Sequence, residues 1–199
     1  GIINYDPTEL VITARAGTPL SKVENLLNDA GQMLPFEPPH FGLGATVGGM
    51  VASGLSGPRR PWAGAVRDYV LGVRLIEGNG NLLRFGGEVM KNVAGYDLAR
   101  LMVGSFGCLG ILTEVSLKVL PKPRQSTSLS LEMNSAQALE RLAVWGQQPI
   151  PITAACHDGR EAPFVADGPQ CRDRGLAHQC DLGPGGELDE SGDDLVRHV

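Results

Sequence analysis

The chain has 199 residues, of which 42% are hydrophobic and 20% are charged, and its formal net charge is −5. This length can form one domain with a sizeable core, and the composition is typical of a globular protein rather than a disordered or collagen-like one. The acidic balance argues against non-specific binding to nucleic acid. No apolar run approaches the roughly 18 residues that a membrane-spanning helix needs. The four cysteines lack zinc-site spacing, so we expect reduced thiols at Cys108, Cys156, Cys171 and Cys180.

Charge and hydrophobicity change towards the C-terminal end of the chain. Residues 155–199 contain ten acidic and four basic side chains, and few large apolar ones. No stretch there repeats apolar residues with a helical or a strand period over enough length to bury one face. We therefore predict a folded body to about Ile152 and a tail of low order over 155–199. A frameshifted coding sequence is our hypothesis for this tail.

The first elements are a strand and a helix. Residues 9–14 are rich in β-branched side chains and lie between turn signals, which predicts a strand. Thr18-Pro19 then caps a helix whose apolar residues recur at helical spacing until Gly31 ends it. The proline-rich residues 35–39 predict an extended loop.

A hairpin and a short helix follow. Residues 69–76 and 82–85 read as two strands joined at Gly78-Asn79-Gly80, and Asn-Gly is a strong hairpin signal. Asp97 is expected to cap a helix over 97–103. Its inward-facing side chains should be Leu98, Leu101 and Met102.

The last predicted strands include the longest one. Residues 109–120 alternate in polarity, with one face formed by Ile111, Thr113, Val115, Leu117 and Val119. Residues 126–133 then predict a strand and 136–145 a helix, which together begin a second α+β unit.

Two glycine-rich segments are the best candidates for a binding surface. The first spans residues 38–54 and has small residues at nearly every position before a short helix; the second spans 104–110. Glycine lets a ligand approach the main chain closely, which suits a phosphate or a flat ring system. The alternative is tight packing of a helix on a sheet and an ordinary helix-to-strand turn. The spacing fits neither a Rossmann fingerprint nor a P-loop.

The two segments and the residues between them resemble the vanillyl-alcohol-oxidase, or PCMH-type, family of flavoproteins. The resemblance covers about residues 1–152, and its motifs read PPHFGLGATVGGMVASGLSGPRRPWAGAVRDYVLG and LRFGGEVMKNVAGYDLARLMVGSFGCLGILTEVSLKVLPKPR. It implies an α+β, PCMH-type FAD-binding fold over 1–123, mainly its antiparallel-sheet subdomain flanked by helices, and the start of a cap domain over 124–154. It implies FAD as cofactor, held by Gly44, Ala45, Thr46, Gly48, Gly49, Ala52, Ser53, Asp68, Gly110 and Ile111.

In its motifs the chain resembles in particular the FAD subunits of bacterial glycolate oxidases. This implies oxidation of a small 2-hydroxy acid such as glycolate to the 2-oxo acid, in a complex with a sister FAD subunit and an iron–sulfur subunit. The resemblance also implies a cytoplasmic protein that associates with the inner membrane only through that complex. Two alternatives stay open: a stand-alone FAD-dependent 2-hydroxy-acid or alcohol oxidoreductase, and a cofactor-free assembly fragment.

Some features depart from the family or carry no assigned role. The glycine-rich loop that holds the FAD pyrophosphate in the family has no counterpart before Gly1, so we expect these 199 residues alone to bind FAD weakly or not at all. His40 is expected at the surface, and Cys108 as a small packing residue. Arg59-Arg60 could attract an acidic substrate or form a solvated turn, and Lys91 could approach an anionic ligand. No residue is assigned as a catalytic base.

Overall fold

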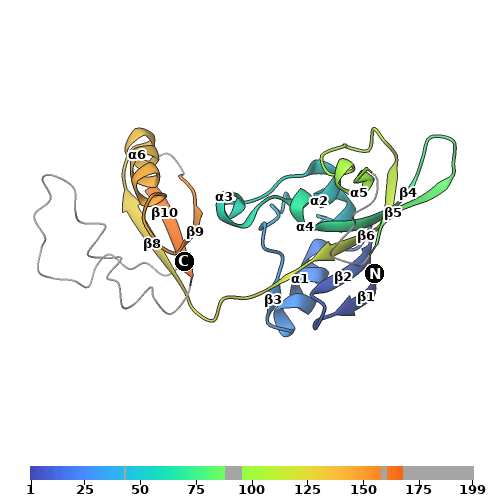
Figure 1. Cartoon of the computed structure of the whole chain (residues 1–199), viewed down its shortest axis with the longest axis horizontal. Coiled ribbons are helices and arrows are strands. Elements are labelled where there is room, and N and C mark those ends of the chain that lie inside the picture. The colour runs from blue at the N-terminus through green and yellow to red at the C-terminus, as the bar shows by residue number, and fades with distance from the viewer. Residues whose placement is uncertain (43, 88–95, 158–160, 168–199) are drawn as a thin grey trace, which may run out of the picture. The chain divides into compact units, whose positions relative to one another are not determined.

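The computed structural model describes residues 1–42, 44–87, 96–157 and 161–167. The chain divides into two compact units, Gly1–Lys122 and Pro123–Val199. The sequence placed this boundary between residues 123 and 124. Each unit has its own sheet (Figure 1).

The first unit is built on a five-stranded antiparallel sheet. Its strand order is β1 (Ile2–Asp6), β2 (Val11–Arg15), β6 (Ile111–Lys118), β4 (Val70–Ile76) and β5 (Leu82–Gly86). The expected hairpin is confirmed: β4 and β5 pair antiparallel, and Gly80 adopts a φ of 84° in the turn between them. The two-residue strands β3 (Gln32–Met33) and β7 (Leu120–Pro121) form a separate pair.

Helices α1, α2, α4 and α5 contribute buried side chains to the same core as the sheet. From α1 these are Leu20, Val23 and Leu27, at the spacing that an amphipathic helix requires. The strands supply the other half of this core, including Ile12 and Leu117. The bounds of the helices are α1 Leu20–Asp29, α2 Val47–Ser53, α3 Arg60–Ala63, α4 Val66–Tyr69 and α5 Leu98–Leu101. Figure 1 shows α1 beside β1 and β2.

Four local expectations are wrong. The first strand of the chain is β1, which the sequence reading missed, and β2 begins only at Val11, because Leu10 takes a positive φ of 57°. Thr18 does not cap α1; its hydroxyl donates to the carbonyl oxygen of Gly1 at 3.0 Å. The loop over 35–39 is not uniformly extended, since Glu37 has a φ of 45°. Of the three side chains expected to face inward, Met102 is buried directly after α5, but Leu101 is 52% exposed and the buried residue within α5 is Ala99.

The long strand alternates as expected only in its second half. Val115 and Leu117 are buried in the core, but Ile111 is 67% exposed. The register between β4 and β6 shifts between Arg74 and Leu75, so that Leu112 rather than Thr113 lies opposite the buried Leu75. An irregularity of this kind moves the residues before it to the other face of the sheet.

The second unit has a three-stranded sheet and one helix. The strand order is β8 (Ser126–Glu132), β10 (Glu161–Asp167), β9 (Ile152–Ala155), and helix α6 spans Ser135–Trp145. Asn134 and Gln137 form a capping box at the start of α6. Strand β10 differs from the expectation of a low-order tail from residue 155. The composition averaged over that tail concealed this short strand, and residues 168–199 lie outside the described part of the chain.

Candidate functional site

The first glycine-rich segment folds into a turn followed by helix α2. Thr46 is the N-cap of this helix, and its hydroxyl oxygen accepts a hydrogen bond from the backbone N–H of Gly49 at 3.1 Å. The segment is fastened to the start of α1 by hydrogen bonds from Leu20 N to Ala45 O at 2.9 Å and from Val47 N to Thr18 O at 3.0 Å. The main chain before α2 is therefore held in one place by backbone contacts.

The two adjacent glycines of α2 serve different purposes. A Cβ added to Gly48 would lie 2.7 Å from the Cβ of Ala16, so Gly48 is needed for packing. Gly49 is exposed, and a Cβ there would meet only the Thr46 hydroxyl oxygen, at 3.2 Å. Gly48 thus shows the tight packing that the alternative interpretation expected, while Gly49 leaves exposed main chain, and its contact with a ligand stays a prediction.

A cavity of about 340 Å³ opens over the exposed side of this segment. Half of the ten residues expected at the cofactor line it: Gly44, Ala45, Thr46, Gly49 and Ser53. Their contact with a cofactor stays a prediction. The sequence analysis did not identify the apolar residues that complete the lining. All of them except Leu20 lie within the same glycine-rich segment or directly after it. The apolar lining residues are Leu20, Pro39, Phe41, Met50 and Leu55.

The second glycine-rich segment lies against the end of α2. The carbonyl oxygens of Val51 and Ala52 accept hydrogen bonds from Gly104 N at 3.1 Å and Phe106 N at 2.9 Å. Carbonyls in the last turn of a helix lack intrahelical partners, so this segment supplies the donors that α2 requires. The two glycine-rich segments therefore lie side by side, joined in part through the main chain of Ala52, although no residue of 104–110 is among those that line the cavity.

Gly110 and Ile111 lie at the same end of the sheet as the start of α2, but they are not among the residues that line the cavity. Gly48 N donates to Ala16 O at 2.8 Å, and Ala16 N donates to Thr113 O at 2.8 Å, which links α2 to the first part of β6. A Cβ at Gly110 would lie 2.8 Å from the carbonyl oxygen of Ile76. The glycine there permits close approach of β6 to β4.

Asp68 has a structural role at the start of α4. Its Oδ2 accepts a hydrogen bond from Ala65 N at 2.9 Å, which caps α4. The neighbouring Tyr69 is buried, and its hydroxyl donates to the carbonyl oxygen of Ala63. Burial raises the pKa of Tyr69 above its usual value of 10.0, and the negative charge of Asp68 raises it further. Asp68 is therefore held by the turn 63–69 and is not among the residues that line the cavity.

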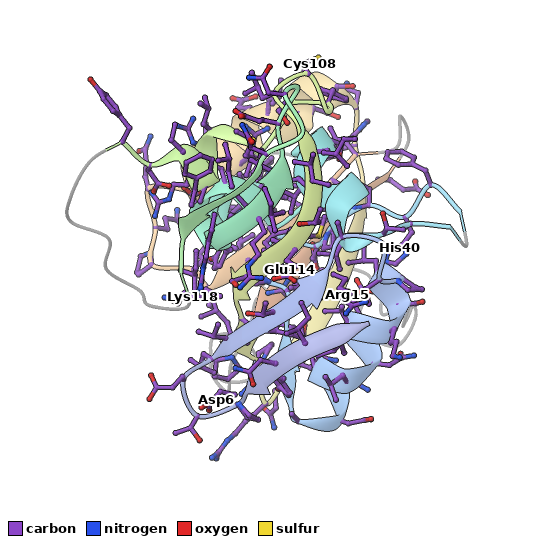
Figure 2. The ribbon with its side chains drawn as sticks, turned by 90° about the vertical axis from the view of Figure 1, so that its right-hand side faces the viewer. Asp6, Arg15, His40, Cys108, Glu114 and Lys118 are labelled. Carbon is purple, nitrogen blue, oxygen red and sulfur yellow. The ribbon has the colours of Figure 1, made fainter. Side chains whose placement is uncertain are left out.

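The remaining candidate side chains give mixed results. His40 is at the surface as expected, and its ring forms an ion pair with Glu24 at 2.9 Å when protonated. Cys108 is an exposed thiol, so the expectation that it packs in the interior is wrong; Figure 2 shows it and His40 in separate loops. Arg59 is neither a solvated turn residue nor a free cation, since its side chain is 11% exposed and its Nε contacts Glu37 Oε1 at 2.9 Å. Lys91 lies outside the described residues.

The lining of the cavity limits the chemistry that it can perform. It carries hydroxyl, main-chain and apolar groups but no titratable side chain, so it can hold a ligand and offers no general base. In the described part of the chain, no group of three or more His, Cys, Asp or Glu side chains could hold a metal ion. Within the same residues, no helix is both long and apolar enough to span a bilayer.

Comparisons with known proteins give the site its context. A family model described as "FAD binding domain" matches residues 1–86. The chain is 67% identical over 157 residues to glycolate oxidase subunit GlcE of Escherichia coli, covering 79% of this chain and 45% of that protein. It is 36% identical over 154 residues to glycolate oxidase subunit GlcD of Bacillus subtilis, covering 76% and 33%. It is 37% identical over 128 residues to a D-lactate dehydrogenase of Anaerostipes hadrus, covering 64% and 26%.

A solved structure of an alkyldihydroxyacetonephosphate synthase confirms the fold. It superposes with a TM-score of 0.69 at 21% identity, covering 86% of this chain and 37% of that one. The chain thus has the expected PCMH-type fold, while it spans less than half the length of the curated relatives it matches.

These matches identify FAD as the cofactor. The residues present fit part of this cofactor, because Gly44 and Gly49 line a solvent-open cavity and leave the main chain accessible where a Cβ would otherwise intervene.

Proposed function

We propose that this chain, whose residues 1–86 match a family model described as "FAD binding domain", is part of the FAD-binding subunit of a glycolate-oxidising complex. The reaction is the two-electron oxidation of glycolate, or another small 2-hydroxy acid, to the corresponding 2-oxo acid. The observation that carries this proposal is the 67% identity to a glycolate oxidase subunit, which extends over 157 residues of this chain.

The tertiary structure supports the proposal by what this chain's residues do. The small residues of the loop before α2 and of its exposed face hold the cavity open, and Thr46 fixes the start of the helix. The donors of residues 104–106 fix its end. A flavin, when bound, supplies the capacity to accept the two electrons of the oxidation, and the protein supplies position and surroundings. The apolar side chains of Leu20, Met50 and Leu55 form a part of the cavity wall that excludes water.

The proposed partners are a sister FAD subunit and an iron–sulfur subunit that passes electrons onward. Such an arrangement would bring the protein to the inner membrane through the complex, without a spanning helix of its own. The similarity to a protein named glycolate oxidase subunit GlcD supports the existence of two related FAD-binding chains in such systems.

A second candidate is a stand-alone FAD-dependent 2-hydroxy-acid dehydrogenase. The observation that favours it is the similarity to D-lactate dehydrogenases, including those of Anaerostipes hadrus at 37% and Archaeoglobus fulgidus at 35% identity. The two candidates share the cofactor and the type of oxidation. They differ in whether turnover needs other subunits.

The deciding experiment uses the complete protein, purified alone and together with its co-expressed sister subunits. FAD binding is measured by fluorescence titration, and oxidation by the reduction of a dye with glycolate or D-lactate as substrate. Glycolate-dependent reduction only in the presence of the sister subunits supports the leading proposal, and turnover by the isolated protein supports the second candidate. Failure of the complete protein to bind FAD in either form overturns both and favours a cofactor-free assembly role.

A further inference from the structure

Almost the whole cavity is formed by one continuous stretch of chain. Nine of its ten lining residues fall within 39–55, and Leu20 is the exception. Residues 38–56 therefore form a long loop that contains α2 and carries the cavity. Contacts between the two stems of this loop therefore act together with the hydrogen bonds at both ends of α2 to keep the cavity in shape.

The two stems are fastened together by main-chain and side-chain contacts. Gly57 N donates to the carbonyl oxygen of Phe36 at 2.9 Å. The Glu37 carboxylate accepts two hydrogen bonds from Arg59, one from its backbone N–H at 3.2 Å and one from Nε at 2.9 Å. We call this group, made of Phe36, Glu37, Gly57 and Arg59, the 37–59 clasp. It closes the loop at its base.

The clasp is anchored in the core and tightly packed. Phe36 is fully buried, and its ring centroid lies 5.6 Å from that of Tyr69. A Cβ on Gly57 would come within 2.5 Å of the carbonyl oxygen of Glu37, so only glycine permits this approach of the two stems. The Arg59 side chain is 11% exposed and that of Glu37 is 40% exposed, so water screens the carboxylate side of this ion pair while the arginine side is packed.

Glu37 also has an unusual backbone. Its φ of 45° lies in the left-handed region, which a non-glycine residue rarely adopts. Such a conformation persists when the surrounding contacts determine it, and it often marks a functional constraint. Here the surrounding contacts are the two hydrogen bonds from Arg59. The positive φ directs the Glu37 side chain to the opposite stem, where it accepts them.

We infer that Glu37 and Arg59 are a positioning pair that preorganises the FAD cavity, an inference that rests on the proposed function. Neither residue is among those that line the cavity, so neither is a direct contact. The stems that they join carry Pro39, Phe41 and Leu55, which do line it. If the clasp opens, these stems must be ordered when the ligand binds, and the cost of that ordering weakens binding.

The test compares Glu37→Ala and Glu37→Gln with a matched control, Glu114→Gln. Glu114 is a suitable control because its carboxylate also contacts an arginine Nε, that of Arg74, at 3.1 Å. This second ion pair lies on the sheet, where Glu114 is beside Arg15 (Figure 2). In the complete protein, we expect the Kd for FAD to rise about tenfold in Glu37→Ala and about threefold in Glu37→Gln, corresponding to about 1.4 and 0.65 kcal/mol. The control should stay within twofold of the wild type.

Two further measurements separate positioning from a general loss of stability. The urea midpoint of the apoprotein should fall no further in Glu37→Gln than in Glu114→Gln, and the anisotropy of bound flavin should fall in Glu37→Gln alone. Arg59→Lys, which keeps the charge but loses the Nε donor, should reproduce the Glu37→Gln effect, and combining both changes should add little.

Wild-type affinity and anisotropy in both Glu37 variants would overturn this inference while leaving the proposed function intact. A wild-type protein that binds no FAD would overturn both.

Discussion

The adjacent glycines of α2 offer a test of the argument that one packs the helix and the other opens the cavity. In Gly48→Ala, the new Cβ would lie 2.7 Å from the Ala16 Cβ and 3.1 Å from its carbonyl oxygen. Carbon atoms in contact are ordinarily about 3.5–4.0 Å apart, so α2 must move by about 1 Å. That movement strains the hydrogen bonds that join Gly48, Ala16 and Thr113.

The magnitude follows from two opposing effects. Overpacking of this kind costs about 1–3 kcal/mol, and the better helix propensity of alanine offsets at most about 1 kcal/mol of it. We therefore expect Gly48→Ala to lower the free energy of unfolding by about 1–2 kcal/mol. Gly49→Ala has only the Thr46 hydroxyl oxygen near its new Cβ, so its stability should be unchanged or raised by up to about 1 kcal/mol.

Ligand binding should separate the two variants in the opposite sense. Gly49 lines the cavity, so its new methyl group should raise the Kd for FAD in the complete protein by about tenfold, or about 1.4 kcal/mol. The assays are urea unfolding followed by circular dichroism, and FAD titration followed by fluorescence. Equal stability of Gly48→Ala and the wild type, or a larger loss in Gly49→Ala, would refute the assignment of the two glycines.

Substitutions at four other residues test neighbouring parts of the site. Thr46→Ala removes the N-cap of α2 and should cost about 1 kcal/mol in urea unfolding, whereas Thr46→Ser should retain most of it. Gly54→Ala places a methyl group on a residue with a φ of 67°, and it should cost at least about 1–2 kcal/mol by the same assay, with no loss contradicting the backbone argument. Because the folded-state pKa of Tyr69 is raised, its contribution to stability is complete below pH 10 and is lost as the pH rises through the folded pKa. Tyr69→Phe should therefore flatten the fall of the unfolding midpoint above pH 10, and Asp68→Asn should lower the Tyr69 pKa in a spectrophotometric titration.

Sequence patterns were sufficient where one local rule decides the structure. The apolar spacing of Leu20, Val23 and Leu27 predicted α1, and the Asn79-Gly80 turn predicted the β4–β5 hairpin. Asp97 was correctly predicted as an N-cap, since its side chain accepts a hydrogen bond from Arg100 N at 3.0 Å. In each case the responsible residues lie within a few positions of one another.

Patterns failed where a distant segment determines the outcome. The shift in the pairing of β4 with β6 moved Ile111 to an exposed position, although its alternation with Thr113 and Val115 predicted a shared face. The partner of Thr18 is the carbonyl oxygen of Gly1, seventeen residues away, rather than the helix that follows it. Neither event leaves a local sequence signal.

The candidate site divides in the same way. The glycine-rich sequence by itself determined that main chain would be accessible near α2, because no other residue type leaves the backbone so unobstructed. Only the tertiary structure decided that Gly48 packs against Ala16 while Gly49 faces the cavity. The surroundings towards which a Cβ on each residue would point depend on where the sheet lies. It also decided that Glu37 meets Arg59 across the base of the loop, a contact between residues 22 positions apart that no periodicity records.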